Sequence, residues 1–292
     1  MSTATWSTKA KQYLELVRFS HTLFALPFAL MALFLALPGE WPSPRTTAWI
    51  LVCMVGARTA AMAYNRLVDR DVDAENPRTR NRHLPAGFVG VTEVVLLVVG
   101  ASAVFVVGAA ALNPLAFALS PVVLVVLLGY SHLKRFTALC HLGLGVALGL
   151  APLGVWIAVR GAIDASAWVP AMLGLAVLCW VSGFDILYAC QDTEFDRGAG
   201  LHSIPARFGV PRALWIARLS HGAMLLALVG LGLLAQLGIV YAIGVALTAA
   251  LLAYEHRLVR ADDLSRIDVA FFTVNGCISL LLCAFTIAEQ FA

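Results

Sequence analysis

Residues 168–196 read WVPAMLGLAVLCWVSGFDILYACQDTEFD, and this stretch joins the two patterns that decide the fold. Its first part is apolar over roughly 20 residues, the length that an α-helix needs to cross the hydrocarbon core of a bilayer. Its last part carries carboxylates at Asp185, Asp192 and Asp196. The stretch therefore predicts a membrane helix whose end presents an acidic face.

Long apolar runs recur along the whole chain, which is 61% hydrophobic and 13% charged. We expect an all-α fold, a polytopic membrane bundle of about nine transmembrane helices that forms a single integral-membrane domain over residues 1–292. The first run is too long for the apolar region of a signal peptide, so it should stay in the mature protein. The predicted spans are residues 18–37, 46–66, 91–112, 115–131, 138–159, 168–189, 212–235, 238–256 and 269–288.

The basic residues indicate the orientation of this bundle, because Lys and Arg are retained in cytoplasmic loops. With a cytoplasmic N-terminus, the segment before the first span and those after spans two, four, six and eight, taken with the adjoining ends of the spans, contain 17 of the 20 Lys and Arg residues. Arg45 and Arg160 fall on the other side, and Arg58 lies within a span. We therefore predict a reaction site at the cytoplasmic end of the bundle. The net charge of +3 follows from this topology and from an anionic substrate, so no nucleic-acid partner is expected.

Asn65, Asp69 and Asp73 are spaced four residues apart at the end of the second predicted span. Residues at this spacing lie about 40° apart around an α-helix, so these side chains share one face. Arg58 falls on the same side, and a charge within a span is costly, by several kcal/mol, and usually marks a functional group. Acids at a helix end also form ordinary surface pairs, so one such ladder alone does not establish a binding site.

A second ladder repeats this spacing at the end of the sixth predicted span, where Asp185, Tyr188, Asp192 and Asp196 follow at offsets of 3, 4 and 4. Hard divalent cations such as Mg²⁺ prefer carboxylate oxygens and complete their shell with phosphate oxygens. Two such faces opposite one another predict a site that holds a diphosphate between metal ions. A polar loop with Arg and Pro follows each ladder, and loops of this length in a compact protein are usually functional.

Other polar groups are candidates for binding at such a site. Tyr130, Lys134 and Arg135 lie at another predicted cytoplasmic helix end, where the two cations would donate charge-assisted hydrogen bonds to a diphosphate. His141, near the start of the fifth span, is a candidate site-lining group. The six cysteines form no CxxC pair, and we interpret them as small core residues.

Three motifs resemble the signature of the UbiA superfamily of intramembrane prenyltransferases: Asn65-x3-Asp69-x3-Asp73, Tyr130-x3-Lys134-Arg135 and Tyr188-x3-Asp192-x3-Asp196. The resemblance covers nearly the whole chain. It implies that two Mg²⁺ ions, and through them a polyprenyl diphosphate, are bound by Asn65, Asp69, Asp73, Asp192 and Asp196. It also implies that Lys134 and Arg135 grip the diphosphate and that Arg58 lies near an aromatic acceptor. We assign Tyr130, Tyr188 and His141 to the same acceptor site, and removal of the proton to Asp185 or Asp192.

Further motifs resemble the branch described as 4-hydroxybenzoate polyprenyltransferase-like. They are Asn76-Pro-Arg-Thr79-x2-Arg82-x-Leu-Pro85-x-Gly87, Leu139-Cys-His141, Tyr254-Glu-His256 and Phe271-Phe-x2-Asn275. Bacteria that carry this branch often make menaquinone by the futalosine route. The chain departs from ubiquinone-type members, which tend to have Pro-Gln where Cys140-His141 stands. The acceptor therefore stays open between 4-hydroxybenzoate and a dihydroxynaphthoate.

The implied function is Mg²⁺-dependent transfer of a polyprenyl group from polyprenyl diphosphate to a ring carbon of a small aromatic acid, in ubiquinone or menaquinone biosynthesis. Such an enzyme would lie in the bacterial inner membrane, where membrane lipid surrounds the prenyl chain. Two alternatives stay open: a haem or chlorophyllide prenyltransferase, which differs in the acceptor pocket, and a cation-coupled membrane transporter. Transporter carboxylates usually lie near the middle of the membrane, whereas these lie at helix ends.

Overall fold

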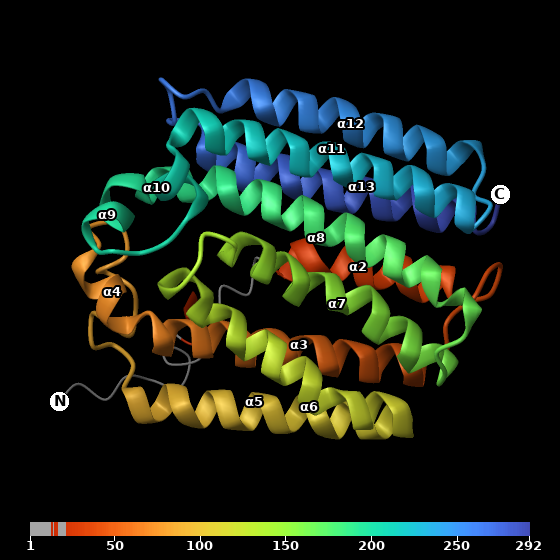
Figure 1. The fold of residues 1–292 in the computed structure, drawn as a ribbon. Helices are drawn as coiled ribbons and strands as arrows, with labels where there is room; N and C mark the ends of the chain where they lie inside the picture. Colours follow the sequence, from red (N-terminus) through yellow and green to blue (C-terminus); the bar gives the residue numbers. More distant parts are fainter. Residues whose placement is uncertain (1–12, 14, 17–21) are drawn as a thin grey trace.

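The computed structural model describes Tyr13, Glu15, Leu16 and residues 22–292, without the side chains of residues 22–24. This part of the chain is all-α and contains no strand (Figure 1). Eight of its helical segments are long and apolar enough to cross a membrane. A shorter apolar helix, α2 (Thr22–Leu35), coincides with the first predicted span, whose residues 18–21 lie outside the described part. The all-α prediction is confirmed, and the predicted count of about nine spans is close.

The long helices run along one common direction, and short helices gather at one end of the bundle, on the left in Figure 1. The long helices are α3 (Pro44–Val68), α5 (Val91–Leu112), α6 (Pro114–Gly129), α7 (Cys140–Arg160), α8 (Trp168–Ala189), α11 (Val210–Leu234), α12 (Ile239–Leu258) and α13 (Asn275–Glu289), the last preceded by the π-helical turn η5 (Val269–Val274). The short ones at that end include α4 (Arg70–Glu75), η2 (Tyr130–Arg135), η4 (Cys190–Asp192), α9 (Thr193–Gly198) and α10 (Ile204–Phe208).

Helix α8 occupies the interior of the bundle. Of an apolar 18-residue stretch in the span that contains α8, 72% is buried, a larger share than in the other candidate spans. Leu173, Trp180 and Val181 on this helix are fully buried. A helix that is apolar on every side is stable when neighbouring helices surround it. The acids at the end of α8 are therefore held by a rigid element.

Glycines bring the helices around α8 into close contact. A Cβ atom on Gly149 of α7 would lie 2.7 Å from the carbonyl oxygen of Gly174 on α8, and a Cβ on Gly145 would lie 2.6 Å from the carbonyl oxygen of Leu178. Small residues permit such backbone approach between membrane helices, where packing provides much of the association energy. The same principle applies at Gly183, where a Cβ would lie 2.2 Å from the ring of His221.

Both acidic ladders are interrupted at corresponding points, which corrects the expectation that each lies on one continuous helix. Helix α3 ends at Val68 and α4 begins at Arg70, with Asp69 between them at φ −87° and ψ 5°. Helix α8 likewise passes into the 3₁₀ turn η4 before α9 begins. Beyond these interruptions the acids face inward: Asp73, Asp192 and Asp196 are 5%, 8% and 0% exposed.

We predict that Gly149→Ala destabilises the protein by about 1–3 kcal/mol, because the added methyl group forces α7 away from α8. Gly154→Ala is the matched control: it lies on the same helix, and its added methyl group would meet no neighbouring atom within 4 Å. Thermal unfolding in detergent should show a lower midpoint for Gly149→Ala alone. Equal midpoints for the two variants would contradict the close α7–α8 contact.

Candidate functional site

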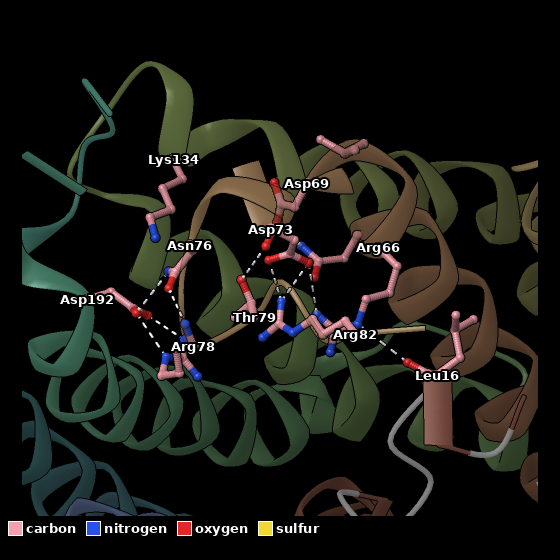
Figure 2. A network of polar contacts seen from close by, with 12 residues as sticks. Leu16, Arg66, Asp69, Asp73, Asn76, Arg78, Thr79, Arg82, Lys134 and Asp192 are labelled. Carbon is pink, nitrogen blue, oxygen red and sulfur yellow. Dashed lines mark hydrogen bonds and ion pairs between the residues drawn. The ribbon is translucent and has the colours of Figure 1, made fainter. Parts of the chain in front are cut away.

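The two acidic ladders meet at the end of the bundle where the short helices lie (Figure 2). The loop that follows the first ladder makes the connection. Asn76 Nδ2 donates a hydrogen bond to Asp192 Oδ1 at 3.1 Å, and Arg78 Nε donates to the same oxygen at 2.9 Å. A second nitrogen of Arg78 contacts Asp192 Oδ2, so the guanidinium engages both carboxylate oxygens. Residues more than 110 positions apart in the chain thereby form one cluster.

Every acid of this cluster contacts a basic side chain. Arg82 Nη1 lies 2.6 and 2.7 Å from the two oxygens of Asp73. Such pairing is required because a buried carboxylate without a counter-charge is strongly destabilising. The other pairs are Asp69 Oδ1 with Arg135 Nη1 at 3.1 Å, Asp196 Oδ1 with Lys134 Nζ at 2.8 Å, and Asp192 with Arg78 as described above.

Burial and neighbouring charges shift the pKa values of Asp69 and Arg78 in this cluster. Burial raises the pKa of the Asp69 carboxyl above its usual value, against the opposing influence of Arg135. For Arg78, burial lowers the pKa of the guanidinium, but the hydrogen bond and charge of Asp192 outweigh it, so that the pKa is raised overall. Arg78 therefore stays charged, and Asp69 is held less firmly in its charged form than an exposed aspartate.

The structure brings the predicted metal and diphosphate residues together from α3, α4, η2, η4 and α9, with Asp69 at the break between α3 and α4. Asn65 Nδ2 donates to Asp69 Oδ2 at 2.9 Å. Lys134 and Arg135 lie on η2, between the ladders, and each points at an acid. Arg135 also donates to the backbone oxygen of Val68 at 2.7 Å, which satisfies a carbonyl at the end of α3. Asp71 was not expected to be a ligand, and its side chain is 83% exposed and pairs with Arg70.

The predicted acceptor residues lie on the helical side of this cluster. His141 Nδ1 lies 2.7 Å from Asp185 Oδ2, and the charges of Asp185 and Arg58 both act on the hydroxyl of Tyr130. His141 itself is only 2% exposed, so it lies behind Asp185 instead of on an open wall. These residues come from α3, η2, α7 and α8, which converge here.

Tyr188, three residues after Asp185 on α8, belongs to an aromatic wall. Its ring centroid lies 4.3 Å from that of Phe271, and the Arg78 guanidinium lies over its ring at 5.2 Å. Arg78 Nη1 also donates to the Tyr188 hydroxyl at 3.1 Å. Phe184 continues the wall at 5.2 Å from Phe271. The wall provides apolar ring faces directly beside the charged cluster.

Four residues of the cluster were not predicted individually: Asn76, Arg78, Arg82 and Ser203. Ser203 Oγ donates to Asp196 Oδ2 at 2.8 Å and also caps the first turn of α10. All four lie in the two polar loops that follow the ladders. The position of these loops was the available signal, but spacing along a loop does not indicate which side chain reaches which acid.

A cavity of about 270 Å³ adjoins Asp73. Its lining includes three arginines, Arg66, Arg78 and Arg82, together with Leu16, Asn81 and a pair of His83 with Glu15, whose Nε2 and Oε2 lie 3.1 Å apart. Positive side chains thus outnumber the single carboxylate. Arg66 is 6% exposed, and its Nη1 lies 3.9 Å from Asp73 Oδ2. Such a lining is suited to an anionic group.

The oxygen donors of the cluster meet part of the requirements of a divalent metal. Asn65, Asp69, Asp73, Asp192 and Asp196 offer amide and carboxylate oxygens, the ligands that Mg²⁺ prefers. Within the described residues, however, no three acidic, histidine or cysteine side chains are close enough to hold a metal ion alone. Mg²⁺ usually keeps several ligands that are water or phosphate oxygens, so one or two carboxylates per ion are sufficient. The residues fit Mg²⁺ if a phosphate-bearing ligand completes its coordination.

Two known proteins that are similar in sequence to this chain carry the same enzyme name. The chain is 33% identical over 295 residues to the 4-hydroxybenzoate octaprenyltransferase of Aromatoleum aromaticum, covering 97% of this chain and 96% of that protein. It is also 33% identical to the enzyme of the same name from Nitrosospira multiformis, over 77% of this chain and 78% of that one.

Solved structures agree with this relationship. The apo structure of a UbiA homolog from Aeropyrum pernix K1 superposes with a TM-score of 0.83 at 34% identity, covering 92% of this chain and 98% of that one. A UbiA homolog from Archaeoglobus fulgidus, solved bound to GPP and Mg²⁺, has a TM-score of 0.71 at 25% identity, over 96% and 99% of the two chains. The sequence model of the UbiA prenyltransferase family matches residues 25–276. This chain, with its paired acidic ladders at one end of a helical membrane bundle, belongs to the UbiA prenyltransferase family.

Proposed function

We propose that this protein transfers a polyprenyl group from a polyprenyl diphosphate to a ring carbon of a small aromatic acid, in a Mg²⁺-dependent step of respiratory quinone biosynthesis. The observation that carries the proposal is the junction of the two acidic ladders through Asn76 and Arg78. The names of the relatives from Aromatoleum aromaticum and Nitrosospira multiformis support 4-hydroxybenzoate as acceptor. A dihydroxynaphthoate is the second candidate acceptor.

The diphosphate would bind where acids and cations now pair with one another. Metal-bound diphosphate carries both signs of charge, so the metal can take the acids while the phosphate oxygens take the cations. Asn65, Asp69, Asp73, Asp192 and Asp196 would hold Mg²⁺, which supplies positive charge to the leaving diphosphate. Lys134 and Arg135 would donate to its oxygens. Arg78 and Arg82, which now hold Asp192 and Asp73, are suited to join them.

In the transfer step, the bond between the allylic carbon and the diphosphate oxygen breaks, and its electron pair leaves with the diphosphate. A ring carbon of the acceptor forms the new carbon–carbon bond and then loses its proton. Tyr188 and the adjacent phenylalanines offer ring faces that stabilise developing positive charge and exclude water. The prenyl chain would extend between the helices toward lipid.

Asp185 is favoured over Asp192 as the group that accepts a proton from the acceptor, either the phenolic proton or the proton of the attacked ring carbon. Both oxygens of Asp192 are engaged by Arg78, and Asn76 adds a further hydrogen bond. Asp185 is 28% exposed at its side chain, and the charge of Arg58 acts on the same Tyr130 hydroxyl as the charge of Asp185. Arg58 would bind the acceptor carboxylate, with Tyr130 beside it.

The protein is proposed to lie in the bacterial inner membrane with this end of the bundle in the cytoplasm, since most Lys and Arg residues belong to the loops at this end. A cation-coupled transporter is disfavoured. Its carboxylates would be expected near mid-membrane, whereas these acids lie beyond or at the last turn of the spans and pair with loop residues.

The acceptor is tested with purified protein, Mg²⁺ and a polyprenyl diphosphate, offered 4-hydroxybenzoate, 1,4-dihydroxy-2-naphthoate or haem in separate reactions. We expect a prenylated product from one of the two aromatic acids, because Arg58 and Asp185 provide one group for a carboxylate and one for a phenol. Activity with haem alone would defeat the aromatic-acid proposal.

We predict that Asp69→Asn and Asp192→Asn each lower kcat by about 100-fold or more, because each removes a charged ligand that is needed as charge develops on the leaving group. Asp71→Asn is the matched control, since Asp71 lies between Asp69 and Asp73 in the chain but is exposed and pairs with Arg70. Turnover and thermal unfolding are measured on all three. Near-normal turnover in both ladder variants would count against their metal role.

Arg78→Gln should raise KM for the prenyl diphosphate by about tenfold or more, because a hydrogen bond to a charged group contributes about 1.5–3 kcal/mol. Arg80→Gln, two residues along the same loop and exposed, is expected to keep the wild-type KM. Steady-state kinetics with varied prenyl diphosphate provide the comparison. If the two variants have the same KM, Arg78 does not contact the diphosphate.

A further inference from the structure

His141 occupies a buried position between the candidate acceptor site and the second polar loop. It lies in the first turn of α7, where its side chain is 3% exposed. Its ring reaches Asp185 on α8, with Nδ1 at 2.7 Å from Oδ2. Gly145, one turn farther along α7, permits the close approach of the two helices on which this contact depends. Ser182 Oγ donates mainly to the carbonyl oxygen of Leu178 on its own helix at 2.7 Å, and it also lies 3.3 Å from the backbone oxygen of His141.

The other ring nitrogen determines which tautomer is present. The backbone N–H of Ile204, at the start of α10, donates to His141 Nε2 at 3.3 Å. A backbone amide is always a donor, so Nε2 must offer a lone pair and the ring proton must lie on Nδ1. That proton faces Asp185. Both nitrogens are therefore engaged, and a ring flip would break two hydrogen bonds.

This arrangement leaves one oxygen of Asp185 for another partner. Oδ2 accepts the hydrogen bond from His141, and within the described residues Oδ1 accepts none. The carboxylate is partly exposed, in contrast to the histidine behind it. A carboxylate with one oxygen held by a fixed donor has a defined orientation, as with histidines that are oriented by carboxylates in metal and hydrolase sites.

The segment that holds His141 also contacts the diphosphate side of the site. Ser203, adjacent to Ile204, donates to Asp196 Oδ2 at 2.8 Å. The backbone N–H of His202 donates to the carbonyl oxygen of Lys134 at 2.8 Å. Three consecutive residues thus connect the second ladder, the basic turn η2 and the His141–Asp185 pair. This connection sets the position of the second ladder relative to the His141–Asp185 pair.

We infer that His141 is a positioning residue: by donating Nδ1–H to Asp185 Oδ2, with its own ring fixed by the Ile204 amide, it orients Asp185 Oδ1 toward the phenolic hydroxyl of the aromatic acceptor. The inference rests on the proposed function and names the acceptor group that the pair recognises. His141 does not touch the substrate, and it takes up no proton in the reaction.

The test compares His141→Phe, which keeps a ring without a donor, with His141→Asn, whose amide nitrogen can replace Nδ1. Each is made in the wild type and in an Asp185→Asn background. We expect His141→Phe to lower kcat/KM for the acceptor by about tenfold, with KM for the prenyl diphosphate unchanged. His141→Asn should keep much of the wild-type kcat/KM for the acceptor. In the Asp185→Asn background His141→Phe should change kcat/KM less than about twofold, because coupled residues are not additive. Full activity of His141→Phe, or the same loss in both backgrounds, would overturn the inference.

A second measurement does not depend on the folding of the phenylalanine variant. Nitrogen-15 spectra of histidine-labelled protein, with the His141→Asn variant used for assignment, should show His141 protonated at Nδ1 and unprotonated at Nε2 near neutral pH. Protonation at Nε2 would overturn the inference even if the enzyme is active. A wild-type protein that prenylates no aromatic acid would instead overturn the proposed function, and the inference with it.

Discussion

The pairing of buried acids with loop cations at one end of an apolar bundle is the interaction on which the rest of the structure depends. Asp73 and Asp196 are nearly or fully buried, and a carboxylate in such surroundings is tolerated only with a counter-charge and hydrogen bonds. Arg82 and Lys134 supply these charges. Because the cations come from loops and from η2, their pairing draws these segments over the helix ends. The site and the fold of this end therefore form together.

The helices provide a rigid frame for this polar cluster. Helix α8 is buried along most of its length, and glycines on α7 and α8 bring the two backbones into contact. The interruptions at Asp69 and in η4 then turn the last acids of each ladder toward the interior. The corresponding interruption in both ladders agrees with their similar sequence setting, in which a polar loop follows each acidic stripe. The geometry of this site thus depends on both a rigid bundle and locally broken helices.

Hydrophobic runs made the spans predictable within a few residues, as for residues 46–66 against Pro44–Val68, because burial in lipid demands a continuous apolar helix. The spacing of the acids predicted that each ladder shares a face, and Lys134 and Arg135 were predicted as cations at another helix end of the same side. The breaks at Asp69 and Cys190 were not, because periodicity assumes an unbroken helix. Neither was the contact of Arg78 with Asp192, 114 residues away, since loop geometry and long-range packing decide it. His141 was predicted near the site, but its position behind Asp185 depends on the crossing of α7 and α8.

Both ladders should bind one diphosphate through Mg²⁺. Isothermal titration calorimetry tests this directly. The purified wild type and the Asp73→Asn and Asp196→Asn variants are titrated with a non-hydrolysable prenyl thiodiphosphate, with and without Mg²⁺. We expect Mg²⁺-dependent binding to the wild type and a large loss of affinity in both variants. Binding that needs no Mg²⁺, or that persists when either ladder is altered, would contradict a shared diphosphate site.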